Sequence, residues 1–217
     1  MKTFLKNNWY ILTLYLICIG VSVAFLLSYG KIPIHLYINQ FVGNKYIDNF
    51  FYYITFLGDG RVMPFLLAAI LIYNIRTGLY ATASFAVATT ITSLLKYHYD
   101  VDRPFHVFKW TIHLPLKYVD AGDLHIHNSF PSGHATQAFA IFMCLVFCCR
   151  RPELKFLFFI LALMATFSRV YLSQHWLVDI TAGSIIGTFS SLFFYFLFIH
   201  NNRLRKFNKP LFKNNRS

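Results

Sequence analysis

Long apolar runs limit what this chain can fold into more than any other feature. The stretch WYILTLYLICIGVSVAFLLSY, Trp9–Tyr29, contains no charged residue. A helix that crosses a bilayer needs about 20 mostly apolar residues. Charged residues make up 13% of the 217-residue chain, whereas soluble domains carry about 25%. The sequence therefore predicts an all-α integral membrane protein with one domain, residues 1–217.

Six apolar runs are predicted to cross the membrane. Val62–Ile75 is short, but Arg61 and Arg76 flank it and their side chains can snorkel toward the headgroups. Phe156–Ser168 is also short and can be extended to Tyr171. The first run lacks a small-x-small cleavage site, which favours a retained anchor helix over a cleaved signal peptide. The predicted spans are Trp9–Tyr29, Val62–Ile75, Thr77–Leu95, Ala135–Cys149, Phe156–Ser168 and Leu177–Ile199.

Two segments are not expected to span. Lys31–Gly60 mixes apolar, aromatic and polar residues and predicts one or two amphipathic helices in the interface. Tyr97–Phe130 is polar and predicts a loop. Its histidines either bind a metal or face water and headgroups, and the second interpretation is favoured, so no metal is predicted. These histidines are His98, His106, His113, His125 and His127.

The cysteines and two of the glycines in the apolar runs are predicted to have packing roles rather than chemical ones. All four cysteines, Cys18, Cys144, Cys148 and Cys149, lie in apolar stretches, which argues against a disulfide framework or a zinc site. Gly183 and Gly187 are four apart on the last predicted span. They either form a dimer face or allow close packing inside the bundle, and close packing is favoured. The oligomeric state is not predicted.

The basic residues predict an orientation. With six spans, twelve of the 20 Lys and Arg residues fall on the side of the two termini and eight on the other. Basic residues are retained on the cytoplasmic side, where they face anionic lipid. The tail, residues 203–217, is part of this bias. We therefore expect both termini in the cytoplasm of a plasma (inner) membrane protein, and membrane lipids rather than nucleic acid as partners of the basic residues.

Four helix ends that carry polar residues fall on one side of the membrane. Because successive spans alternate in direction, the end of the third and fifth spans and the start of the fourth and sixth must meet there. These ends carry Lys96, His134, Arg169 and His175. The predicted topology places this face toward the periplasm or the cell exterior.

The charges on this face suit a phosphoryl group. Lys96, Arg103 and Arg169 bring three cations to one place, and guanidinium groups pair with phosphate oxygens bidentately. The turn Pro131-Ser132-Gly133-His134 opens a helix. Free backbone N–H groups and the positive end of the helix dipole favour an anion there, and Ser132 adds a hydroxyl while Gly133 permits close approach.

Two histidines can divide the chemistry. His175 and Asp179 are four apart at a helix start and share a face. The carboxylate can hold one imidazole N–H, which leaves the other nitrogen as a nucleophile. His134 can protonate the leaving oxygen as a general acid. No cluster of carboxylates suggests a metal, so no cofactor is predicted and the cations neutralise the developing charge.

The three segments together resemble the type 2 phosphatidic acid phosphatase superfamily. The pattern Lys-x6-Arg-Pro, Pro-Ser-Gly-His and Ser-Arg-x5-His-x3-Asp is complete here, from Lys96 to Asp179. The resemblance implies a metal-independent phosphatase in which His175 is the nucleophile, Asp179 orients it and His134 is the acid. It also implies phosphate binding by Lys96, Arg103, Ser132, Gly133 and Arg169.

Membrane members of this superfamily act on lipid phosphates, so the resemblance implies such a substrate. The lipid phosphates on which these members act are phosphatidic acid, phosphatidylglycerol phosphate, undecaprenyl diphosphate and the phosphates of lipid A. Two alternatives stay open. A transferase would hand the phosphoryl group to another lipid instead of water. A non-catalytic lipid-phosphate binder or transporter is disfavoured, because binding alone needs the cations and not the intact His134, His175 and Asp179.

Overall fold

The computed structural model describes residues 2–119, 125–200 and 202–211. Within these ranges the chain is all helical, as the sequence predicts. Part of the basic tail, including residues 212–217, lies outside the described residues. The helices are α1 (Lys2–Tyr29), α2 (Lys31–Asn39), α3 (Lys45–Ile54), η1 (Thr55–Gly58), α4 (Met63–Tyr73), α5 (Ile75–Tyr99), α6 (Pro104–His106), η2 (Val107–Ile112), α7 (Gly133–Cys148), α8 (Pro152–Tyr171), α9 (Leu177–Phe194), η3 (Tyr195–Ile199) and η4 (Asn202–Phe207).

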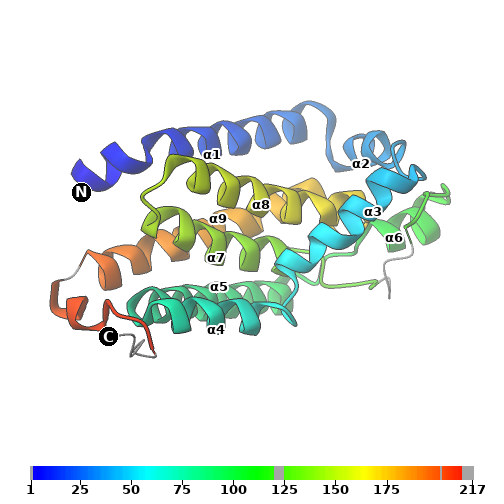
Figure 1. Ribbon diagram of the computed structural model, residues 1–217. Coiled ribbons are helices and arrows are strands. Elements are labelled where there is room, and N and C mark those ends of the chain that lie inside the picture. The colour runs from blue at the N-terminus through cyan, green and yellow to red at the C-terminus, as the bar shows by residue number, and fades with distance from the viewer. Residues whose placement is uncertain (1, 120–124, 201, 212–217) are drawn as a thin grey trace.

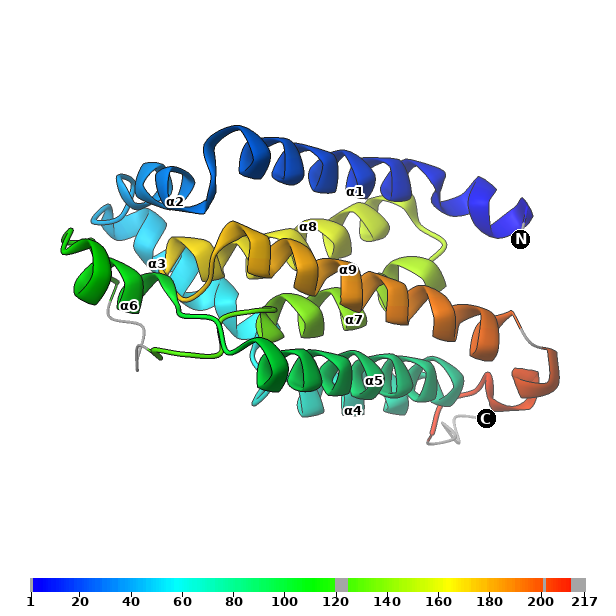
Figure 2. The same ribbon diagram turned by 180° about the vertical axis from the view of Figure 1, so that it is seen from behind.

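The long helices lie side by side and form an elongated bundle (Figures 1 and 2). Helices α7, α8 and α9 lie between α1 on one side and the pair α4 and α5 on the other. The short helices α2, α3 and α6 gather at one end, and both chain ends lie at the other. The short helices α2, α3 and α6 therefore form a cap over the end of the bundle that lies away from the start of α1.

The centre of the bundle is the close contact between α7 and α9. A Cβ atom at Gly187 would lie 2.4 Å from the Thr136 carbonyl oxygen, and one at Gly183 would lie 2.6 Å from the Ser132 carbonyl oxygen. Glycine is therefore required for the two backbones to approach this closely. The predicted close packing inside the bundle is confirmed for both glycines. Helix α7 is consequently buried along most of its length.

Within the described ranges of the chain, four helices are long and apolar enough to cross a membrane. They are α1, the stretch from α5 to η2, α8, and α9 with η3. Helix α4 is too short by itself, but it forms a bent pair with α3 and η1, and counting this pair as one span gives five. Helix α7 is apolar but has 16 residues. The structure thus supports four or five spans, and six stays a prediction.

The residues between α1 and α4 form short helices, and these helices also pack against α7 and α8. The hydroxyl of Tyr171 in α8 directs its one proton toward two acceptors, Asp48 Oδ1 at 2.5 Å and the Phe41 carbonyl oxygen at 3.0 Å. Asn44 caps α3 by accepting from the backbone N–H of Tyr46. These contacts hold α3 across α8, so that η1 reaches the end of the bundle where α7 begins (Figure 1).

Two expectations about polar segments were wrong in detail. Residues 97–130 are not all loop, because α5 continues to Tyr99 and is followed by α6 and η2. Arg76 does not snorkel to the headgroups. It is buried, and its guanidinium donates to the carbonyl oxygens of Phe198 and Ile199. These carbonyls lie at the end of the last long helix, where a cation is favourable.

Candidate active site

The predicted site residues come together at the end of the bundle that carries the short helices. Asp179 lies in the first turn of α9, and His175 directly precedes that helix. Ser132 is the N-cap of α7. Its backbone N–H donates to the Asp179 carbonyl oxygen at 3.0 Å, which joins the starts of α7 and α9. The ends of four helices therefore frame one polar region, as the alternation of the spans predicts.

Asp179 is fully buried and is held in place by several donors. Its Oδ2 accepts from the Ser129 hydroxyl at 2.5 Å and from the Trp176 backbone N–H at 2.9 Å. The same oxygen lies 3.5 Å from His175 Nδ1. The hydrogen bond from the Trp176 N–H to Asp179 closes the N-terminal turn of α9 in the manner of a capping box. The carboxylate is thus fixed behind the imidazole ring.

His175 is buried, with 2% of its side chain exposed. Burial lowers the pKa of His175 well below its usual value, and the positive charges of Arg103, Lys96 and Arg169 lower this pKa further. The imidazole is therefore neutral at neutral pH. A neutral ring that presents Nδ1 toward Asp179 leaves Nε2 with a free lone pair, which is what a nucleophile requires.

The three cations are held by neutral groups. Arg103 is buried and donates to the His127 carbonyl at 2.9 Å and to Gln174 Oε1 at 3.1 Å. Arg169 is also buried and donates from one terminal nitrogen to Thr55 Oγ1 at 2.9 Å. Lys96 donates to the Asn128 carbonyl. Because none of these partners carries a negative charge, the region keeps a strong positive potential.

Part of this donor capacity is unused. Among the described residues, Arg169 Nε is buried without a hydrogen-bond partner. The Ser132 hydroxyl accepts from the Ala135 N–H at 3.4 Å and so can still donate its proton. A Cβ atom at Gly133 would meet open space. These three residues can surround an anion at the start of α7, where backbone N–H groups also point outward.

His134 lies in the first turn of α7, and its side chain is 24% exposed. Its Nε2 lies 4.0 Å from Asp59 Oδ2, a carboxylate that also pairs with Arg61 at 2.7 Å. Burial lowers the pKa of His134 well below its usual value, the positive charge of Arg169 lowers this pKa further, and the Asp59 carboxylate opposes the shift only in part. The pKa values of His134 and His175 are thus both lowered by burial and by the cations of the site, and His134 differs in having the Asp59 carboxylate nearby. A bound phosphate anion would offset these cations and favour protonation of His134.

Several neighbours of the site could not be identified from the sequence motifs. Ser129 holds Asp179, Thr55 holds Arg169, Gln174 holds Arg103 and Asp59 faces His134. Ser129 and Gln174 adjoin motif residues in the chain, which was the only available signal for them. Thr55 and Asp59 lie in the segment between α1 and α4, where nothing in the sequence connects them to the motifs.

Two of the loop histidines, His106 and His127, form a small polar cluster with Asp102 next to the site. Asp102 Oδ1 lies 2.9 Å from His127 Nδ1 and 3.2 Å from His106 Nδ1. The Asp102 carbonyl accepts from Trp176 Nε1 at 2.9 Å. In the described part of the chain, no three His, Cys, Asp or Glu side chains are grouped as a metal site requires. These contacts anchor the residues just before Arg103.

Comparison with known sequences identifies relatives of this chain. The sequence model described as the PAP2 superfamily matches residues 77–203. A lipid A 4'-phosphatase from Bacteroides thetaiotaomicron is 35% identical over 68 residues, which are 31% of this chain and 30% of that protein. An undecaprenyl-diphosphatase from Sulfolobus acidocaldarius is 29% identical over 54% of this chain and 52% of its own length. The matches thus span about a third and about half of these curated relatives.

Two solved structures share the fold. The crystal structure of Aquifex aeolicus LpxE has a TM-score of 0.66 and 23% sequence identity, and the match covers 76% of this chain and 93% of that one. The crystal structure of a transmembrane PAP2 type phosphatidylglycerolphosphate phosphatase from Bacillus subtilis has a TM-score of 0.61 and 18% identity. That match covers 89% of this chain and 98% of the other. The apolar helices and these likenesses identify an integral membrane protein.

Proposed function

This chain belongs to the PAP2 superfamily, and on that basis we propose that it is a membrane phosphatase which hydrolyses a lipid phosphomonoester or diphosphate. Candidate substrates are phosphatidic acid, phosphatidylglycerol phosphate, undecaprenyl diphosphate and the phosphates of lipid A. Named relatives act on lipid A and on undecaprenyl diphosphate. The chemistry common to all four is a phosphoryl group at the membrane surface.

One observation carries the proposal. Three cations with neutral partners surround a buried, uncharged His175 that has Asp179 behind it. A phosphoryl group supplies the missing negative charge, and its phosphorus atom is the electrophile that a neutral imidazole attacks. A binder would need the cations alone, so the fixed carboxylate behind the ring favours catalysis.

The proposed reaction has two steps. His175 Nε2 forms a bond to phosphorus while the bond from phosphorus to the lipid oxygen breaks, and protonated His134 gives that oxygen its proton. Asp179 stabilises the charge that develops on the His175 ring. Water then attacks the phosphorus atom while His134 takes its proton, the bond from phosphorus to His175 Nε2 breaks, and inorganic phosphate leaves. Lys96, Arg103, Arg169, Ser132 and Gly133 bind the phosphoryl oxygens throughout.

The purified protein should release phosphate from at least one of the four lipid phosphates in detergent. We expect the same rate in excess EDTA, because the positive charge that a metal would supply comes from Lys96, Arg103 and Arg169. Phosphate release is measured over the four lipids, with and without chelator. A second lipid alcohol is included as a possible acceptor, and the products are separated by chromatography.

The outcomes of this assay are distinct. Phosphate release that stops in EDTA and returns with Mg²⁺ would contradict the metal-free mechanism and require a metal-bridged phosphate. Phosphoryl transfer to the lipid alcohol without release to water would replace the hydrolase by a transferase. No turnover of any lipid phosphate by folded protein would overturn the proposal.

We also propose that the site faces the periplasm or the cell exterior, with both termini in the cytoplasm. The basic bias toward the terminal end of the bundle supports this. Lys109 and Lys209 are both exposed. Lys109 lies in η2, which directly follows α6, whereas the carbonyl of Lys209 accepts from the Ile75 N–H at the start of α5, at the other end of the bundle. In a background without native cysteines, an impermeant thiol reagent on intact cells should label Lys109→Cys and spare Lys209→Cys.

Permeabilised cells provide the control, because both cysteines should then react. Labelling of Lys209→Cys but not Lys109→Cys in intact cells would reverse the orientation. The substrate would then have to come from the inner leaflet. Labelling of both or of neither in intact cells would place Lys109 and Lys209 on the same side of the membrane, which contradicts the three spans proposed between them.

A further inference from the structure

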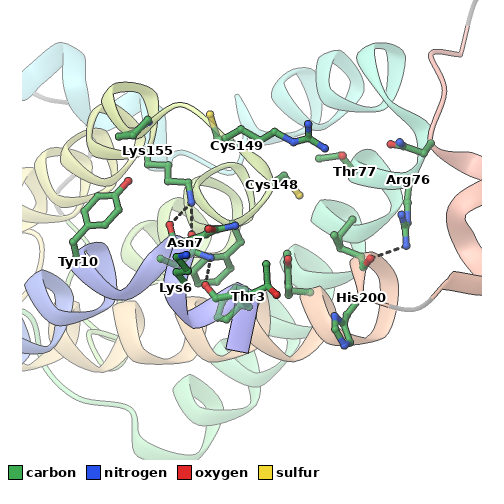
Figure 3. Close-up of a pocket in the computed structure, with 18 residues that line it drawn as sticks. Thr3, Lys6, Asn7, Tyr10, Arg76, Thr77, Cys148, Cys149, Lys155 and His200 are labelled. Atoms are coloured by element: carbon green, nitrogen blue, oxygen red, sulfur yellow. Dashed lines mark hydrogen bonds between the residues drawn. The ribbon is translucent and has the colours of Figure 1, made fainter. Parts of the chain in front are cut away.

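A cavity of about 910 Å3 lies at the end of the bundle opposite the catalytic residues. It is lined by the start of α1, the turn between α7 and α8, the start of α5, and the end of α9 with η3 (Figure 3). Lys155 of α8 and Arg76 of α5 lie on opposite sides of it in Figure 3. None of the proposed catalytic or phosphate-binding residues lines this cavity, so it is a separate place on the molecule.

Lys155 is a buried cation of this cavity and is 3% exposed. Its ammonium donates to the Asn7 carbonyl at 2.7 Å and to Asn8 Oδ1 at 2.6 Å. Both partners are neutral. An ammonium has three protons, so it can donate to one more acceptor. A buried cation that has only neutral partners is costly unless an anion compensates it.

The other polar side chains of the cavity add positive charge. Arg76 is 7% exposed, while Lys6 and Arg150 line the cavity from exposed positions. No aspartate or glutamate is among the described residues that line the cavity. Among the described residues that line the cavity the cations are therefore not balanced by acidic side chains, and an anionic ligand would balance them.

The size and position of the cavity indicate which anion fits. Phe4, Phe147 and Tyr195 add an apolar surface beside the cations. A ligand with both an anionic group and apolar chains matches this mixture, whereas a bare phosphate ion leaves most of the volume unfilled. The cavity also lies at the ends of α1, α5 and α8, three of the helices that are long and apolar enough to cross a membrane. Basic pockets between such helices are known to bind anionic lipid headgroups.

We propose that this cavity binds the phosphodiester headgroup of an anionic phospholipid. Lys155 is the buried contact, and Lys6 and Arg150 hold the headgroup at the rim. The lipid would join the start of α1, whose membrane-crossing part is largely exposed, to α5 and α8. This binding is independent of the catalytic site and does not require the protein to be a phosphatase.

The test compares two double variants of the full chain in neutral detergent. Lys6→Gln/Arg150→Gln removes two exposed rim charges without disturbing the core. Lys2→Gln/Arg151→Gln is the matched control, because these residues are also exposed but do not line the cavity. Binding of phosphatidylglycerol, phosphatidylcholine and inorganic phosphate is titrated by native mass spectrometry.

Wild type and control should bind phosphatidylglycerol in preference to phosphatidylcholine. The rim variant should bind it about 30-fold more weakly, as the loss of two basic contacts predicts. Lys155→Met should weaken it as well. Equal affinity of the rim variant and the control would overturn the proposal. Saturation by inorganic phosphate with no preference for phosphatidylglycerol would show that the cavity binds a free anion. That result would overturn the proposal of a phospholipid ligand.

Discussion

His175→Ala should reduce phosphate release by about 10⁴-fold or more, since removal of a nucleophile that acts with its partners has this scale of effect. His175 is the proposed site of the covalent bond to phosphorus, so its removal abolishes the proposed route to the phosphoryl intermediate. Wild-type enzyme quenched with a ³²P-labelled lipid substrate should carry label that is labile to acid and stable to base, as a phosphohistidine is. The His175→Ala protein should carry none.

His98→Ala is the matched control, because His98 is exposed on α5 and should leave activity unchanged. Since His175 is buried, thermal unfolding of the variant must be measured to show that it is folded. Turnover near the wild-type rate in His175→Ala would refute the covalent mechanism. Label that is lost in base would instead indicate an acyl phosphate on a carboxylate.

The gathering of the motifs could be predicted because it depends on topology rather than on details of packing. Helix ends that carry Lys96, His134, Arg169 and His175 must share a face when the spans alternate. The spacing of His175 and Asp179 at a helix start likewise determines that they lie together. Both inferences hold even though helix boundaries differ from prediction by several residues. Local periodicity and parity are robust to such errors.

What the sequence does not reveal is set by contacts between distant segments. Thr55 and Asp59 reach the site because Tyr171 of α8 binds two points in the preceding segment, Phe41 before α3 and Asp48 within α3. The burial of Arg76 depends on where the last long helix ends. The number of spans is similarly uncertain from sequence, because α7 is short and is buried by protein on nearly all sides. Hydropathy cannot distinguish protein from lipid as an apolar surrounding.

The contact between α7 and α9 leads to the second large effect. In Gly183→Ala, the new Cβ would lie 2.6 Å from the Ser132 carbonyl and 3.0 Å from Ala135 Cβ. The start of α7 must move away, and overpacking of this kind costs about 1–3 kcal/mol of stability. Displacement of the catalytic groups by about 1 Å should lower turnover by about 100-fold. Thermal unfolding in detergent and phosphate release measure the two effects.

Gly20→Ala is the matched control, since Gly20 is also a helical glycine but a Cβ there has no neighbour within 4 Å. Alanine favours a helix over glycine, so this variant should be unchanged or slightly more stable. The difference between the two variants isolates close packing from helix propensity. If Gly183→Ala matched Gly20→Ala in both stability and turnover, α7 and α9 would have room to separate. The position of Ser132, Gly133 and His134 relative to His175 would then not depend on this contact.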